Sequence, residues 1–260
     1  MKKVIAIIAM VATLILATAL SGCTTPSTVT ATATPTTGGE VTAVPTAGSS
    51  PGTVATGAPK ATVDGDNVKI AGSKDGNVTV NLKKGGYIIE YKYQGNSFDM
   101  KVNSFIGAMR IVPGGQYAGA DGWTVFSTVQ KFTNDDGTEF IITATDPYEV
   151  NFKRLPLSTS ADVVPKTYTG TGEMVVGPMT LKAGSASFKI SAPDLNKAGF
   201  SVKLLDATTG DSVATITPSR AEMESNILDM TVTKTIEADG NYLMDVGANG
   251  ATAWTIDVSQ

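Results

Sequence analysis

Apolar and polar residues alternate with a period of two from about residue 61 to the end of the chain. In the clearest run, residues 87–94, three tyrosines and an isoleucine occupy one phase and polar residues the other, with Ile88 as the exception. Residues 98–103 and 254–258 alternate in the same way. Such segments are typical of strands with one face in a core and the other in water. Because long helical stripes are missing, the pattern predicts an all-β fold, with at most a helical turn at residues 219–225.

The predicted strands occur twice, in the same order along the chain. Residues 82–85 have a counterpart at 181–184, and residues 148–152 have one at 254–258. Between these matches lie two more, which pair residues 98–102 with 200–204 and the turn Asp136-Gly137 with Asp239-Gly240. Four matches in one order indicate a duplicated unit.

We therefore expect two tandem antiparallel β-sandwiches, with either a jelly-roll or an immunoglobulin-like topology. The first is expected over residues 61–155 and the second over residues 168–260. Residues 156–167 contain two prolines and are expected to connect them.

The end of the second unit has a recognisable sequence. It contains Asp239-Gly240-Asn241-Tyr242, followed by the alternating residues 254–258. This ending resembles the closing strands of a small β-sandwich domain that is repeated in exported prokaryotic lipoproteins. The resemblance covers most of residues 178–258 and, more faintly, residues 78–153. It implies a fold and no catalytic residues.

The segment before the strands has a different composition. Residues 24–59 consist mainly of Thr, Ala, Pro, Gly, Ser and Val, with Glu40 as their one charged residue and no aromatic residue. Such a segment buries too little apolar surface to offset the entropy of ordering it. We expect residues 23–60 to form a disordered tether.

The N-terminus has the layout of a secretory signal. Lys2 and Lys3 precede an apolar or small stretch that reaches Leu20, which is short for a membrane span. The stretch ends in Leu20-Ser21-Gly22-Cys23, and Cys23 is the only cysteine of the chain. These residues resemble the lipobox of prokaryotic lipoprotein signal peptides. The resemblance implies that residues 1–22 are removed and that a lipid on Cys23 holds the protein at the extracytoplasmic face of the cell membrane.

Composition removes several classes of function. The chain has no histidine, and histidine is the usual acid/base group near neutral pH and the commonest metal ligand. The net charge is −4, and no basic run follows Lys3, so there is no electrostatic footprint for nucleic acid. We expect no nucleic acid partner, no cofactor and no bound transition metal, and we expect the protein not to be an enzyme.

Two local patterns have competing interpretations. Asp64-Gly65-Asp66-Asn67 begins like a calcium loop, but the next alternate ligand position is Val68, so a tight turn is the favoured interpretation. The tyrosines of residues 87–93 are suited either to stacking against a sugar or to packing in a core. Core packing is favoured because Ile89 shares their phase.

Candidate binding residues lie in the glycine-rich segment 106–123. Tyr117, Asp121 and Trp123 combine two aromatic rings and a carboxylate there, which suits a glycan or a surface protein as partner. The alternative is that Trp123 starts the next strand and packs inward. Asn77, in Asn77-Val78-Thr79, is a candidate acceptor for N-linked glycosylation.

Three functional hypotheses follow, in decreasing order of preference. The first is a non-enzymatic, lipid-anchored cell-surface protein that displays two β-sandwiches for binding or for envelope structure. The second is a carbohydrate- or small-ligand-binding module at the cell surface. The third is a hydrolase that uses carboxylates alone, and it requires two acids facing one cleft.

Overall fold

The structure of the chain is a computed structural model. The structure describes residues 56–260, except 96, 105–106, 111–118, 120, 136, 196–198, 220–226 and 251. Within these residues the fold is all-β, as the alternation predicts, and none of them forms a helix long and apolar enough to cross a membrane. The helical turn predicted at 219–225 lies outside the described residues, apart from Ser219.

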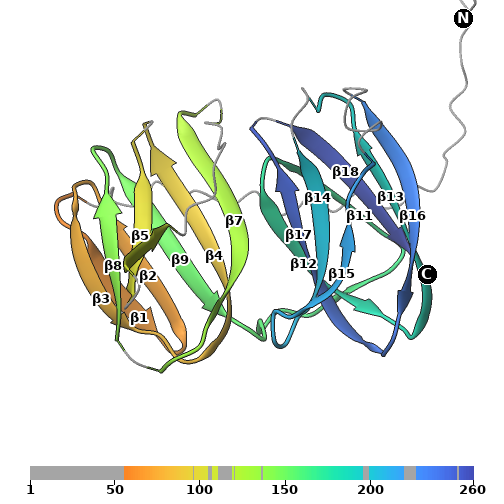
Figure 1. Cartoon of the computed structure of the whole chain (residues 1–260), viewed down its shortest axis with the longest axis horizontal. Helices are drawn as coiled ribbons and strands as arrows, with labels where there is room; N and C mark the ends of the chain where they lie inside the picture. The colour runs from red at the N-terminus through yellow and green to blue at the C-terminus, as the bar shows by residue number, and fades with distance from the viewer. Residues whose placement is uncertain are drawn as a thin grey trace, which may run out of the picture. The chain divides into compact units, whose positions relative to one another are not determined.

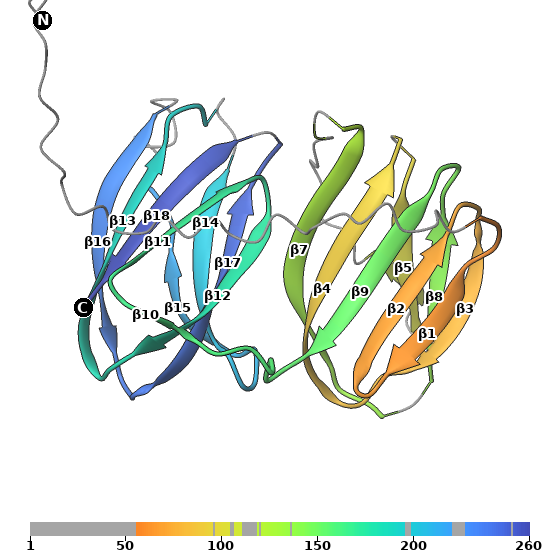
Figure 2. The same ribbon diagram turned by 180° about the vertical axis from the view of Figure 1, so that it is seen from behind.

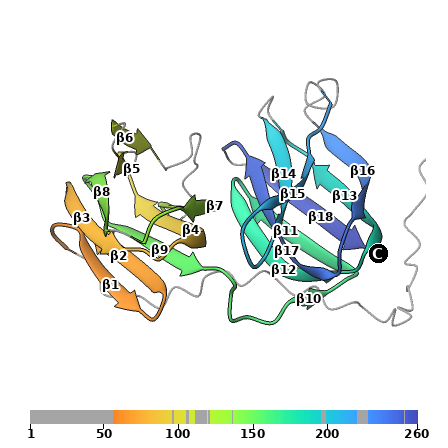
Figure 3. The same ribbon diagram turned by 60° about the horizontal axis from the view of Figure 1, so that its bottom comes forward.

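Two sheets make up the first half, hereafter the first sandwich. Its strands are β1 (Lys60–Asp64), β2 (Asn67–Gly72), β3 (Gly76–Asn81), β4 (Gly85–Gln94), β5 (Asp99–Ser104), β6 (Gly107–Arg110), β7 (Trp123–Phe132), β8 (Gly137–Thr143) and β9 (Tyr148–Arg154). One sheet has the order β1-β2-β9-β4-β7, and Figure 2 shows these strands side by side. The other has the order β3-β8-β5-β6, with β6 beside β5 in Figure 3.

The second half, hereafter the second sandwich, repeats this construction. Its strands are β10 (Asp162–Val163), β11 (Lys166–Thr171), β12 (Met174–Leu181), β13 (Gly184–Ala192), β14 (Phe200–Asp206), β15 (Ser212–Ile216), β16 (Leu228–Ile236), β17 (Gly240–Ala248) and β18 (Ala253–Ser259). They form sheets in the orders β10-β12-β17-β14-β15 and β11-β18-β13-β16 (Figure 1). Strand β10 and the start of β11 therefore lie in the segment expected to be a connection.

The sheet topology agrees with the correspondence predicted from the sequence. The sequence matches equate β4 with β13, β5 with β14, β8 with β17 and β9 with β18. With these equivalences, the neighbours β9-β4 become β18-β13, and β8-β5 become β17-β14. The flanking strands β2, β7, β3 and β6 then correspond by position to β11, β16, β12 and β15. Strands β1 and β10 are additions to the shared plan. The neighbours in these sheets pair antiparallel, except for the short parallel contact of β10 with β12.

Each sandwich has its own apolar core. Tyr87, Tyr91 and Tyr93 are buried in the first one, so core packing is confirmed for them and the sugar-stacking interpretation is wrong. Trp254 is buried in the second one, where its indole N–H donates to the Gly172 carbonyl at 2.9 Å. Residues 64–67 form a two-residue hairpin turn between β1 and β2, as favoured from the sequence.

Candidate functional site

Strand β7 lies at one edge of its sheet, where β4 is its one neighbour among the described strands. Its other edge meets the second sandwich. The Ser127 N–H donates to the Glu173 carbonyl at 3.3 Å, and the Val175 N–H donates to Ser127 Oγ at 2.8 Å. The Val129 N–H donates to the Asp245 carboxylate. An exposed strand edge invites unwanted pairing, and here the second sandwich covers part of that edge.

An apolar cluster closes one end of this junction. It contains Ile88, Leu155, Leu205, Ala207 and Leu243, with Val129, Leu157 and Val175 packed against it. The backbones also approach closely, because a Cβ added at Gly86 would lie 2.7 Å from the Thr209 carbonyl oxygen. Beside the cluster, Lys131 Nζ and Asp211 Oδ1 form an exposed ion pair at 2.6 Å.

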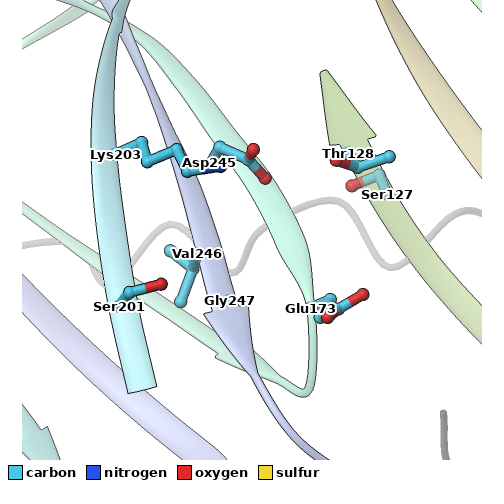
Figure 4. Close-up of a pocket in the computed structure, with 8 residues that line it drawn as sticks. All are labelled: Ser127, Thr128, Glu173, Ser201, Lys203, Asp245, Val246 and Gly247. Atoms are coloured by element: carbon cyan, nitrogen blue, oxygen red, sulfur yellow. The ribbon is translucent and has the colours of Figure 1, made fainter. Parts of the chain in front are cut away.

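A small polar pocket lies at the same junction and is the candidate functional site. Its volume is about 230 Å³, and its lining residues are Ser127, Thr128, Glu173, Ser201, Lys203, Asp245, Val246 and Gly247. Ser127 and Thr128 come from β7, and Glu173 directly precedes β12. Strand β14 contributes Ser201 and Lys203, and β17 contributes the remaining three, Asp245, Val246 and Gly247. Figure 4 shows the side chains of Glu173 and Asp245 directed toward β7.

The rigid pairing of β14 with β17 positions the charged groups of this pocket. Lys203 and Asp245 are direct cross-strand partners, as are Ser201 and Gly247. Burial raises the pKa of Asp245 to about 6, although the positive charge of Lys203 and the Val129 N–H both favour the ionised form. The carboxylate therefore changes charge just below neutral pH, which is unusual for an aspartate.

Trp123 and Asp121 do not line this pocket. Trp123 begins β7, as the alternative interpretation expected, but it does not pack into the core. It pairs with Gln94, is partly buried, and its ring centroid lies 4.7 Å from Lys92 Nζ on the outer face of the sheet. Asp121 is exposed, and its Oδ1 accepts the Trp123 N–H at 3.1 Å, so it holds the start of the strand. Tyr117 lies outside the described residues.

The two candidate modification sites differ in what the structure says of them. Asn77 is exposed on β3, and its Nδ2 donates to Glu139 Oε1 at 3.1 Å. Its glycosylation stays a prediction. Cys23 lies outside the described residues, and its lipidation likewise stays a prediction. Within the described part of the chain, no group of three or more acidic, histidine or cysteine side chains is placed to hold a metal ion.

The sequence contained a signal for this junction. Ile88 and Leu243 are apolar residues in the polar phase of their strands, where water contact is expected. Both are buried in the apolar cluster of the junction. An apolar residue in the solvent phase of a strand indicates that something covers the outer face of the sheet. This signal locates the junction but does not identify Ser127, Glu173 or Asp245.

Comparisons with known proteins add little to this geometry. A scan against protein-family models gave no match, and a search of curated proteins gave none either. Among solved structures, the chain is similar to a conserved protein of unknown function from Pseudomonas aeruginosa (12% identity, TM-score 0.22, covering 75% of this chain and 79% of that one). It is also similar to the N-terminal CBM22-1–CBM22-2 tandem domain of Paenibacillus barcinonensis Xyn10C (8% identity, TM-score 0.21, covering 74% of this chain and 85% of that one).

A third similar structure is a β-porphyranase of glycoside hydrolase family 86 from the gut bacterium Bacteroides plebeius. The match has 13% identity and a TM-score of 0.20, and it covers 77% of this chain and 36% of that one. At such identities and TM-scores, these likenesses say nothing about the activity of this chain.

Proposed function

We propose that the chain is a non-enzymatic, lipid-anchored protein of the cell surface that presents its two β-sandwiches for binding. The observation that carries the proposal is the sequence Leu20-Ser21-Gly22-Cys23 at the end of an apolar stretch, with Cys23 as the only cysteine. A single acyl chain binds membranes only marginally, so a stable anchor requires more than one lipid chain on Cys23. The tether that precedes β1 then separates the sandwiches from the membrane.

The junction supports binding as the role of the sandwiches. Backbone hydrogen bonds, an apolar cluster and an ion pair connect them there, so the pocket walls come from both sandwiches. Polar side chains held on paired strands suit the recognition of a ligand, because their geometry is fixed before the ligand arrives. We propose the junction pocket as the binding site in place of Tyr117, Asp121 and Trp123.

The hydrolase hypothesis has one observation in its favour. Glu173 and Asp245 line the same pocket, and a carboxyl group with a raised pKa is suited to general acid catalysis. However, the Asp245 carboxylate already accepts the Val129 N–H, and this hydrogen bond helps to join the two sandwiches. Changing Asp245 to Asn in the full chain and assaying glycoside hydrolysis separates the two roles, because a binding protein has no turnover to lose.

The anchor is tested by changing Cys23 to Ser in a prokaryotic host that processes lipoproteins. We expect the wild type in the membrane fraction, and the variant either in the medium or as an uncleaved precursor. A variant that is cleaved normally and still sediments with the membrane would rule out the lipid anchor. A Ser21→Ala variant keeps a small residue before Cys23 and serves as the matched control that stays in the membrane fraction.

A further inference from the structure

Strand β1 has an open edge. It is the outermost strand of its sheet, and β2 is its one neighbour among the described strands (Figure 2). All five of its residues are exposed, and the apolar Val63 is 62% exposed. A strand with an open edge can pair with a strand of another chain. The opposite edge of the same sheet, at β7, is partly covered by the second sandwich, whereas no described strand covers β1.

The backbone of β1 has groups available for such pairing. The two-residue turn after β1 places Asp64 opposite Asn67, and a tight turn of this kind closes with a backbone hydrogen bond between these two residues. In an antiparallel pair, alternate residues bond the same neighbour, so every second residue of β1, counted back from Asp64, bonds β2. The N–H and C=O groups of Ala61 and Val63 therefore point to the open edge.

The side chains of β1 complement a second, antiparallel copy of the same strand. When two copies pair with Thr62 opposite Thr62, Lys60 of each copy lies opposite Asp64 of the other. Ala61 then lies opposite Val63, and the outward backbone groups of these residues face each other. Opposite charges and paired threonines directly across from each other stabilise an antiparallel pair. An edge lysine usually opposes pairing, but here an aspartate of the second copy compensates it.

The other edge strands lack this complementarity. It requires an acid and a base on the same face of one strand, because only such side chains meet across a two-fold pair. Strand β16 carries Asp229 and Lys234, but their spacing is odd and places them on opposite faces. The remaining edge strands in the described part of the chain carry charges of one sign or none; they are β3, β6, β7, β10, β11 and β15.

We propose that the protein forms a two-fold dimer in which the β1 strands of two copies pair antiparallel and join their sheets edge to edge. Such a contact is closed, because both copies use the same strand and leave no open β1 edge for a third. The strand has five residues, so the contact is small, and we expect a weak dimer with a Kd above roughly 1 µM. The dimer goes beyond the proposed function and depends on neither the lipid anchor nor the junction pocket.

Charge reversal tests the pairing. The full chain with Cys23→Ser is recovered from the medium and studied by sedimentation equilibrium at concentrations up to about 1 mM. We expect a monomer–dimer equilibrium. Lys60→Asp places two pairs of like charges across the contact and should raise the Kd at least about fourfold, and Asp64→Lys should do the same. The double variant exchanges the charges and should restore the original Kd. Lys189→Asp makes the same change on an exposed position of β13 and should leave the Kd unchanged.

Disulfide formation tests the register. The Cys23→Ser chain has no other cysteine. In the proposed dimer, the two Thr62 residues form a pair without backbone hydrogen bonds, so their Cα atoms lie about 4.5 Å apart, within the range of disulfides. Mild oxidation should therefore link Thr62→Cys into dimers much faster than Thr79→Cys, which is exposed on β3.

Two results would overturn the proposal. The first is a chain that stays monomeric up to about 1 mM, with Thr62→Cys and Thr79→Cys cross-linking at the same rate. The second is a dimer whose Kd is unchanged by both single charge reversals, because the contact would then lie elsewhere. Neither result affects the lipid anchor, which is tested separately by the membrane location of wild-type and Cys23→Ser chains.

Discussion

Changing Asp245 to Asn should make the stability of the protein less dependent on pH. The folded pKa of about 6 lies above the unfolded value of 3.8, so the folded chain holds this proton more tightly than the unfolded chain does. The stability that Asp245 contributes is therefore complete below about pH 4 and is lost as the pH rises through about 6. An asparagine stays neutral throughout and can still accept the Val129 N–H through its side-chain oxygen.

The size of the effect follows from the pKa. Raising a carboxyl pKa from 3.8 to about 6 corresponds to about 3 kcal/mol of folding free energy. Because Asp245 is only partly buried, water screens its charge, and we expect about 1–2 kcal/mol. At pH 7.5 the free energy of unfolding of Asp245→Asn should exceed that of the wild type by this amount. At pH 4 the difference should disappear.

Urea unfolding at several pH values measures this difference. Tryptophan fluorescence, to which the buried Trp254 and the partly buried Trp123 both contribute, reports the transition. Both chains carry Cys23→Ser so that no lipid complicates the assay. Asp229→Asn removes an exposed carboxylate and should leave the pH profile of the wild type unchanged. A stability difference between Asp245→Asn and the wild type that is the same at pH 4 and pH 7.5 would refute the reasoning.

Two further predictions concern the construction of the sandwiches. A fragment of residues 160–260 should be soluble and should unfold cooperatively, because it contains the complete core of the second sandwich. Circular dichroism should show it to be rich in β-structure, and an unfolded fragment would contradict the presence of two independent cores. Gly86→Ala should lower the free energy of unfolding by about 1–3 kcal/mol, because its Cβ would press on the Thr209 carbonyl oxygen. Gly199→Ala, whose Cβ has its nearest neighbour at 3.8 Å, is the control, and equal urea midpoints for the two variants would reject the close approach.

The period-two pattern was sufficient to predict an all-β fold and the buried phase of β4, β5 and β18. Alternation decides which side chains share a face, so the burial of Tyr87, Tyr91 and Tyr93 could be predicted. The matched segments also predicted that two units share one strand order. These properties depend on local spacing, which the sequence contains directly.

The candidate site could not be predicted in this way. Ser127, Glu173 and Asp245 come together because β7 is an edge strand and because the second sandwich covers that edge. Neither property follows from the alternation within a single strand. Trp123 shows the same limit, since its side chain is on the outer face beside Lys92 only because of the register between β4 and β7.

Mass spectrometry of the mature N-terminus tests the proposed lipid anchor most directly. The protein is extracted from membranes with detergent and digested, and the peptide that contains Cys23 is analysed before and after removal of ester-linked lipid. The account predicts a peptide that begins at Cys23 and carries the mass of two or more acyl chains. A peptide that extends from Met1, or a Cys23 with an unmodified thiol, would contradict it.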